Sequence, residues 1–185
     1  MPRLTLLAAA AMTFVIGLPA SAQFIDTQAE YAVIMDYETQ EVLYSKNGSE
    51  PMIPASMTKI MTAHVVYDSI EKGEISLSDE LTVSERAWRE GGWATGGSTM
   101  GLKIGETPTV EDLIRGVVIL SGNDACIVLA EGLTGSEEAF AKLMTEVAQD
   151  MGLKSAHFKN ASGLEAEGHV ISAVDLARLA AMEIK

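Results

Sequence analysis

The stretch PASMTKIMTAHVVYD, residues 54–68, decides how this chain is interpreted. Its apolar second half predicts a buried helix from about Ser56 to Glu71, which Gly73 would end. Lys59 stands in the first turn of this helix, three residues after Ser56. Because the positive end of a helix dipole disfavours a cation, a lysine at this place calls for a chemical reason.

Ser56 and Lys59 are expected to be neighbours on one helix face, since they are three residues apart. Burial near the first turn lowers the pKa of a lysine from about 10.4 toward neutrality, where the amine can act as a base. A neutral Lys59 could then take the proton of Ser56 and make its hydroxyl a good nucleophile. Free backbone N–H groups at the helix start could bind developing negative charge.

Taken alone, Ser-x-x-Lys is a weak signal. A second copy, Ser69 to Lys72, follows at the charged end of the same helix, where a solvated lysine is the ordinary expectation. About one match arises by chance in a chain of this length. A purely structural role for the first copy therefore stays open at this point.

A second element is ILSGNDACIVLAE, residues 119–131, which predicts a turn at Ser121, Gly122 and Asn123 between two apolar helices. Such a turn could hold a hydroxyl and a carboxamide rigidly toward a cleft. In the alternative interpretation, Ser121 or Asn123 merely N-caps the second helix. Two motifs in this order favour a site more than either one does.

The remaining segments predict a mixed α/β (α+β) chain. The runs YAVIMD and EVLYSKN indicate a hairpin that begins an antiparallel sheet. The glycine-rich stretch 91–101 is predicted to be a loop. Helix starts are expected where capping boxes occur, and the segment 140–151 has helical periodicity with Gly152 as its C-cap. The predicted boxes are Thr109 with Asp112, Thr134 with Glu137, and Ser172 with Asp175.

Composition and targeting signals bound the function classes. Residues 1–22 resemble a secretory signal peptide, with Arg3, an apolar stretch and an Ala-Ser-Ala cleavage site, so the protein is expected to be exported. The net charge of −13 argues against a nucleic-acid binder. Cys126, the single cysteine, is expected in the core. No His/Cys/Asp cluster has metal-ligand spacing, and the histidines are expected to be structural.

The two motifs resemble the signature of penicillin-binding proteins and class A β-lactamases, which consists of Ser-x-x-Lys, Ser-Asp-Asn and Lys-Thr-Gly; the carboxypeptidase branch uses Ser-Gly-Asn as the middle element. The chain is most similar to the low-molecular-mass D-alanyl-D-alanine carboxypeptidase branch. The strings AVIMDYETQEVLYSKN, PASMTKIMTAHVV, GLKIGETPTVEDLIRGVVILSGNDACIVLAEGLTGSEEAFAKLM and MGLKSAHFKNASGL resemble that family in order. The resemblance covers nearly all of residues 30–185.

The resemblance implies a role for each matched residue. Ser56 is similar to the acylated serine, and Lys59 to its general base. Ser121 resembles the hydroxyl that relays a proton to the leaving amine. Asn123 resembles the amide that positions Lys59 and the substrate. The glycine-rich loop around Ser98 resembles a family segment that borders the site, and plain flexibility is the alternative role for this loop. The resemblance implies no metal and no organic cofactor.

The chain departs from the family pattern at three places. Gln40 stands where the family usually has glycine, and a positive φ there would cost on the order of 1 kcal/mol. Gly101 stands where an aromatic residue is common, which predicts looser packing of the loop. No Lys-Thr-Gly occurs in the sequence. We therefore expect residues 23–185 to be part of a β-lactamase/transpeptidase-like catalytic domain, with a helical subdomain but without the C-terminal strands of its sheet.

Two function classes follow from the resemblance. The first is a penicillin-sensitive serine carboxypeptidase that acts on peptidoglycan pentapeptides ending in D-Ala-D-Ala, in the periplasm or cell envelope. Membrane association would need a C-terminal segment that this chain lacks. The second is an inactive fragment or weak peptidoglycan-binding module. A β-lactamase is disfavoured because the class A Glu-x-x-Leu-Asn string is absent.

Overall fold

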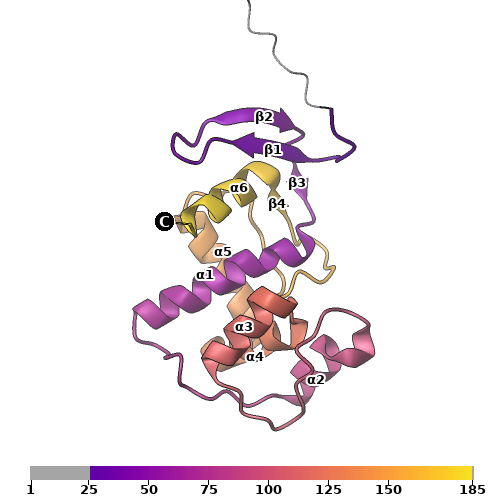
Figure 1. The fold of residues 1–185 in the computed structure, drawn as a ribbon, viewed down its shortest axis with the longest axis vertical. Coiled ribbons are helices and arrows are strands. Elements are labelled where there is room, and N and C mark those ends of the chain that lie inside the picture. The colour runs from indigo at the N-terminus through magenta and orange to yellow at the C-terminus, as the bar shows by residue number, and fades with distance from the viewer. Residues whose placement is uncertain (1–25, 185) are drawn as a thin grey trace, which may run out of the picture.

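The structure is a computed structural model, which describes residues 26–184 (Figure 1). The predicted signal peptide, residues 1–22, lies outside the described residues. The elements in chain order are β1 (Ala32–Met35), β2 (Val42–Lys46), β3 (Pro51–Met52), η1 (Ala55–Met57), α1 (Thr58–Glu71), α2 (Glu85–Gly91), η2 (Trp93–Thr95), α3 (Val110–Leu120), α4 (Asn123–Thr134), α5 (Glu137–Asp150), β4 (Ile171–Ser172) and α6 (Ala173–Met182).

The predicted hairpin is confirmed as the antiparallel pair β1–β2, in which Ala32 lies opposite Lys46. Its turn places Gln40 at a φ of +60°, in the left-handed region, which is the conformation considered for this position because the family usually has glycine there. The side chain of Gln40 partly offsets this strain, because its amide donates a 2.8 Å hydrogen bond to the Tyr37 carbonyl. The hairpin packs on α6.

A second small sheet joins segments that are far apart in the sequence. Pro51 and Met52 of β3 pair with Ser172 and Ile171 of β4 in antiparallel register. The sequence predicted only a connection before the first helix, and two-residue strands carry too little pattern to be recognised. This pairing joins the segment that precedes α1 to the segment that precedes α6.

Helix α1 is the central element of the fold. It contacts α3, α4, α5 and α6, and in Figure 1 it runs between the layer of α6 with the hairpin and the lobe of α2, α3 and α4. The side chains of Met61, Val65 and Val66 are at most 1% exposed. Packing of this kind fixes the start of α1 firmly, because interiors are close-packed.

The helix caps test the capping predictions. Thr109 and Ser172 cap α3 and α6 as predicted, each accepting a backbone N–H three residues on. The box of Thr134 with Glu137 is wrong, since Ser136 caps α5 and Thr134 is the last residue of α4. The predicted face of α5 is confirmed: its apolar residues are buried or packed against the core.

Within residues 26–184, no helix is both long and apolar enough to cross a membrane.

Candidate active site

Ser56 lies in the 3₁₀ turn η1, directly before α1, and its side chain is exposed. The preceding residue, Ala55, has a φ of +48°, a strained conformation for a residue with a Cβ. Gly163 approaches so closely that a Cβ on it would lie 1.8 Å from the Ala55 carbonyl oxygen. The turn that presents the Ser56 hydroxyl is therefore held against the segment around residue 163.

Lys59 lies one turn further on and is buried, with 6% of its surface exposed. Its Nζ atom is 3.3 Å from the Ser56 Oγ, 2.8 Å from the Asn123 Oδ1 and 2.7 Å from the Ser162 carbonyl oxygen. Burial lowers the pKa of Lys59, because the charged form loses its hydration. The structure thus brings together the serine and the lysine that the sequence singled out.

The three neighbours of Nζ determine how a neutral Lys59 would be oriented. The Asn123 and Ser162 oxygens can only accept, so they take the two N–H bonds of a neutral amine. The remaining lone pair then faces the Ser56 Oγ, which is the one neighbour that can donate a proton. This arrangement can take the hydroxyl proton of Ser56 and make it a nucleophile.

The predicted turn at residues 121–123 is confirmed between α3 and α4. Ser121 has a φ of +55° as the C-cap of α3, and Asn123 begins α4. Neither residue is the N-cap of α4: Gly122 occupies that position without a side-chain hydrogen bond. Both therefore keep their side chains available for the site, as the first interpretation required.

Two hollows border Ser56. One, of about 460 Å³, is lined by Ser56, Lys59 and Ser121 together with apolar residues of α1 and α3. The other, of about 500 Å³, is lined by Ser56, Ser98 and Asn123 and by the segment 162–165. Ser98 takes part through its backbone as well, since its carbonyl oxygen accepts the Asn123 N–H at 2.9 Å. Each of the five predicted site residues thus lines at least one of two hollows that share Ser56.

Asp124, which the sequence did not single out, holds the glycine-rich loop beside the site. Its fully buried carboxylate accepts the backbone N–H groups of Met100, Gly101 and Leu102 at 2.8–3.0 Å and the Thr99 hydroxyl at 2.7 Å. Its position directly after Asn123, at the start of a predicted apolar helix, was the available signal.

The Gly101 position differs from the expectation of loose packing. The φ of Gly101 is +82°, and a Cβ there would lie 2.9 Å from the Trp93 indole nitrogen. The Trp93 ring of the same loop thus occupies the space beside this glycine.

The carbonyl of Ser162 is another contact that the sequence did not predict. A backbone acceptor can belong to any residue type, so it leaves no signature in the sequence. Only the position of the chain in space reveals it.

The other candidate reactive side chains among residues 26–184 are not arranged as a nucleophile beside a buried base. The Lys72 side chain of the second Ser-x-x-Lys is 58% exposed and lies 2.5 Å from Asp68. Cys126 is fully buried, and burial raises the pKa of its thiol to about 12, so it is an inert core residue. His169 is buried and bonded to Thr58. Among residues 26–184, no group of acidic, His and Cys side chains could hold a metal ion.

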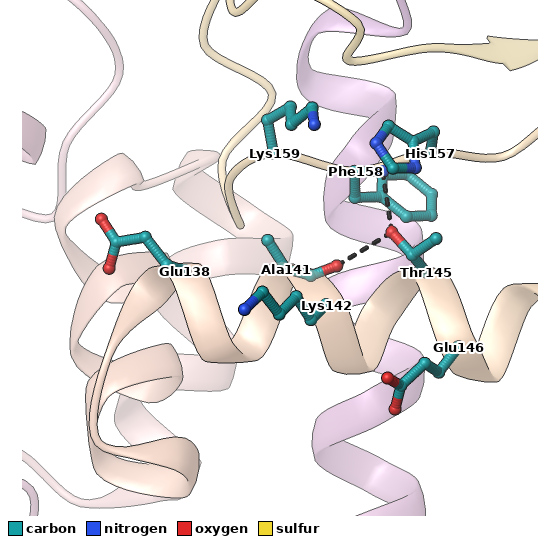
Figure 2. Close-up of a pocket in the computed structure, with 8 residues that line it drawn as sticks. All are labelled: Glu138, Ala141, Lys142, Thr145, Glu146, His157, Phe158 and Lys159. Carbon is teal, nitrogen blue, oxygen red and sulfur yellow. Dashed lines mark hydrogen bonds between the residues drawn. The ribbon is translucent and has the colours of Figure 1, made fainter.

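A separate hollow of about 350 Å³ is lined by residues of α5 and by residues 157–159 (Figure 2). Its one hydroxyl, on Thr145, is already engaged: it donates to the Ala141 carbonyl at 3.0 Å and accepts the Phe158 N–H at 3.0 Å. Lys142 and Lys159 are drawn with Glu138 and Glu146 around this hollow. It contains no paired nucleophile and base.

Comparisons with known proteins agree with this geometry. The family model of D-alanyl-D-alanine carboxypeptidases (Peptidase S11) matches residues 18–185. The D-alanyl-D-alanine carboxypeptidase DacF of Bacillus subtilis is 44% identical over 153 residues, which are 83% of this chain and 38% of the relative.

Solved structures give the same result for the fold. The D-alanyl-D-alanine carboxypeptidase DacD from Francisella tularensis has a TM-score of 0.82 and 37% identity, covering 94% of this chain and 40% of that one. Penicillin binding protein 6B from Escherichia coli has a TM-score of 0.81 and 38% identity, covering 91% and 53%. The expected transpeptidase-like α/β fold is confirmed. The chain spans less than half of the length of the curated relatives it matches.

Proposed function

Because the chain belongs to the D-alanyl-D-alanine carboxypeptidase family, we propose that it carries the nucleophile and the base for serine-type removal of the terminal D-alanine from peptidoglycan pentapeptides. The observation that carries this proposal is the buried Lys59 Nζ, placed between the Ser56 hydroxyl and two oxygens that can only accept. The same chemistry makes the protein a target of β-lactams, which mimic the D-Ala-D-Ala peptide.

The reaction proceeds in two steps. In the first, the Ser56 Oγ forms a bond to the carbonyl carbon of the penultimate D-alanine while its proton passes to Lys59. The C–N bond to the terminal D-alanine then breaks, and the Ser121 hydroxyl relays the proton from Lys59 to the leaving amine. In the second step, water attacks the ester with Lys59 as base, which frees Ser56 and releases the shortened peptide.

Two further features support the first step. The backbone N–H of Ser56 precedes a helix and can donate to the developing oxyanion. Asn123 and Ser98 line the hollow beside Ser56, where the peptide group of the substrate would lie. We assign Asn123 to orientation of both Lys59 and the substrate, and Ser98 to the wall of the cleft.

A labelled penicillin tests the proposal. It should attach covalently to the chain, and Ser56→Ala should abolish the label, because the ester can form only on that oxygen. Ser69→Ala, in the second Ser-x-x-Lys, is the matched control and should keep the label. Equal labelling of Ser56→Ala and the control would contradict the proposal.

Release of D-alanine from a pentapeptide separates the two function classes. Turnover supports the carboxypeptidase. Acylation by penicillin without D-alanine release would instead support the second candidate, a peptidoglycan-binding module that lacks turnover. That candidate is the one the missing Lys-Thr-Gly string favours.

The place of action also belongs to the proposal. We assign residues 1–22 to a signal peptide and residues 23–185 to part of the catalytic domain, which implies export to the periplasm or cell envelope, where peptidoglycan lies. Mass spectrometry of the secreted chain should find its N-terminus at Gln23.

A further inference from the structure

Glu137 is a buried carboxylate outside the site described above. It is the first residue of α5, and its residue surface is 5% exposed. Its Oε2 lies 3.0 Å from the Arg86 Nη2, and its Oε1 accepts the backbone N–H of Ala161 at 3.0 Å. One carboxylate thus joins a cation of α2 to the segment that follows residue 160.

The backbone segment that Glu137 binds also contacts Lys59, the proposed base, and α1. The Ala161 carbonyl oxygen accepts a 2.6 Å hydrogen bond from the Thr62 hydroxyl on α1. The next carbonyl, that of Ser162, accepts from the Lys59 Nζ at 2.7 Å. The Ala161–Ser162 segment is therefore bonded on one side to Glu137 and on the other to α1.

Stability alone does not account for this carboxylate. Burial raises the pKa of Glu137, and the Ala161 N–H and the Arg86 cation oppose that shift. Replacing a buried ion pair by apolar residues of similar volume is often neutral or stabilising. A carboxylate that points both of its oxygens at fixed donors does, however, set the place of those donors in space.

We propose that Glu137, held by Arg86, is a positioning residue: it fixes the Ala161–Ser162 segment and so sets the direction in which the Lys59 amine presents its lone pair to Ser56. This inference rests on the proposed role of Lys59 as the general base. A displacement of a reacting group by about 1 Å can cost about 100-fold in rate, so the contact need not touch substrate to matter.

Two substitutions separate positioning from charge. Glu137→Gln keeps an oxygen that can accept the Ala161 N–H, whereas Glu137→Ala removes it. Both variants lose the same negative charge, so their difference reports the hydrogen bond. The other groups nearby stay constant: Cys126 near Lys59, and Arg86, Glu90 and Glu138 near Glu137.

Asp175, in the first turn of α6, provides a matched control. It is also a buried carboxylate, accepting the Ser155 N–H at 3.0 Å, and it pairs with Arg178 at 3.1 Å. Asp175→Ala therefore removes the same kind of contact without touching residues 161–162.

The experiment measures the rate of acylation by a labelled penicillin against pH in the full chain, corrected for the folded fraction from thermal melts. We expect Glu137→Gln to stay within about 3-fold of the wild type and Glu137→Ala to be slower by about 10-fold or more. The midpoint of the rate against pH should be higher in Glu137→Ala than in Glu137→Gln, because water admitted beside Lys59 restores its hydration. Equal rates in the two variants, or a loss no greater than in Asp175→Ala, would overturn the proposal.

A measurement that needs no activity keeps the inference separate from the proposed function. If the wild type is not acylated, the proposed function fails, and the titration of Lys59 by ¹³C NMR then decides the inference. A midpoint at least about 0.5 pH units higher in Glu137→Ala than in Glu137→Gln supports positioning, and equal midpoints overturn it. If Glu137→Ala does not fold, Arg86→Met takes its place. Its acylation rate and its Lys59 titration midpoint are expected to lie between the wild-type values and those of a chain that has lost the Glu137 contact completely. Wild-type values for Arg86→Met would overturn the proposal.

Discussion

The Nζ atom of Lys59 lies 2.8 Å from the Oδ1 atom of Asn123, although 64 positions separate the two residues in the sequence. The contact joins the first turns of α1 and α4. An amide oxygen orients the amine through a dipole and carries no net charge. The neutral form of the lysine, which burial favours, is therefore kept available.

Asn123→Asp should reverse this effect. A carboxylate next to the amine favours the ammonium form and raises the pKa of Lys59 by about 1–3 units. Because the base must be neutral, acylation by penicillin at pH 7 should fall by about 10-fold or more, and its midpoint should move to higher pH. The rate should recover in alkaline buffer.

The control for Asn123→Asp is Asn47→Asp, directly after β2, which adds the same charge away from the Lys59 amine. Stopped-flow acylation at several pH values measures both variants. An Asn123→Asp profile that loses rate equally at every pH would show that the carboxamide acts only on the substrate.

Lys59→Arg tests whether Lys59 acts as a base or only as a cation. Arginine keeps the charge and donors but stays protonated at all accessible pH values. Acylation should therefore fall by about 100- to 10,000-fold, the usual contribution of a general base. Lys72→Arg, in the second and exposed Ser-x-x-Lys, is the control and should retain the wild-type rate. Comparable acylation rates for the two arginine variants would contradict the role of Lys59 as the general base.

The parts of the site that could be predicted are those that depend on residue type and spacing in the sequence. Ser56, Lys59 and Asn123 have motif spacing, and the helices around them have apolar periodicity and caps such as Thr109. The Ser162 carbonyl was not predictable, because a backbone acceptor depends on where the chain lies and not on residue type.

The same distinction holds for the fold. The hairpin and the helix starts at Thr109 and Ser172 were predicted from local signals. The pairing of β3 with β4 joins residues about 120 positions apart through two-residue strands, which local periodicity cannot detect. The wrong cap at Thr134 has a local reason: Ser136, two residues on, offers the same hydroxyl and begins the helix instead.

Asp124→Asn should loosen the glycine-rich loop. Three backbone N–H groups of residues 100–102 and the Thr99 hydroxyl point at this buried carboxylate, and an amide would place N–H donors against some of them. We expect a loss of about 2–4 kcal/mol in the free energy of unfolding, measured by urea denaturation. Amide exchange of residues 99–102 should also accelerate. Asp112→Asn, at the exposed start of α3, is the control; an equal loss in both variants would contradict the anchoring role.

His169 links the segment that precedes Ser162 to the start of α1. The Lys159 N–H donates to its Nδ1 at 3.1 Å, so in the neutral ring the proton is on Nε2, which donates to the Thr58 hydroxyl at 2.8 Å. Protonation of Nδ1 would set a donor against the Lys159 N–H. His169 as a residue is 1% exposed, and burial lowers its pKa to about 4, with the charges of His157 and Lys159 adding to the shift.

This geometry predicts a loss of stability in acid with a defined window. Above pH 6.5, the ordinary pKa of histidine, both folded and unfolded chains carry a neutral His169. Between pH 6.5 and about 4 only the unfolded chain binds the proton, so the free energy of unfolding decreases as the pH is lowered, by up to about 3 kcal/mol in total. Urea denaturation at several pH values should therefore show a shallower decline across this window for His169→Gln than for the wild type. His64→Gln, which leaves His169 in place, should keep the wild-type decline, and a His169→Gln curve parallel to the wild type would place the acid sensitivity on the carboxylates alone.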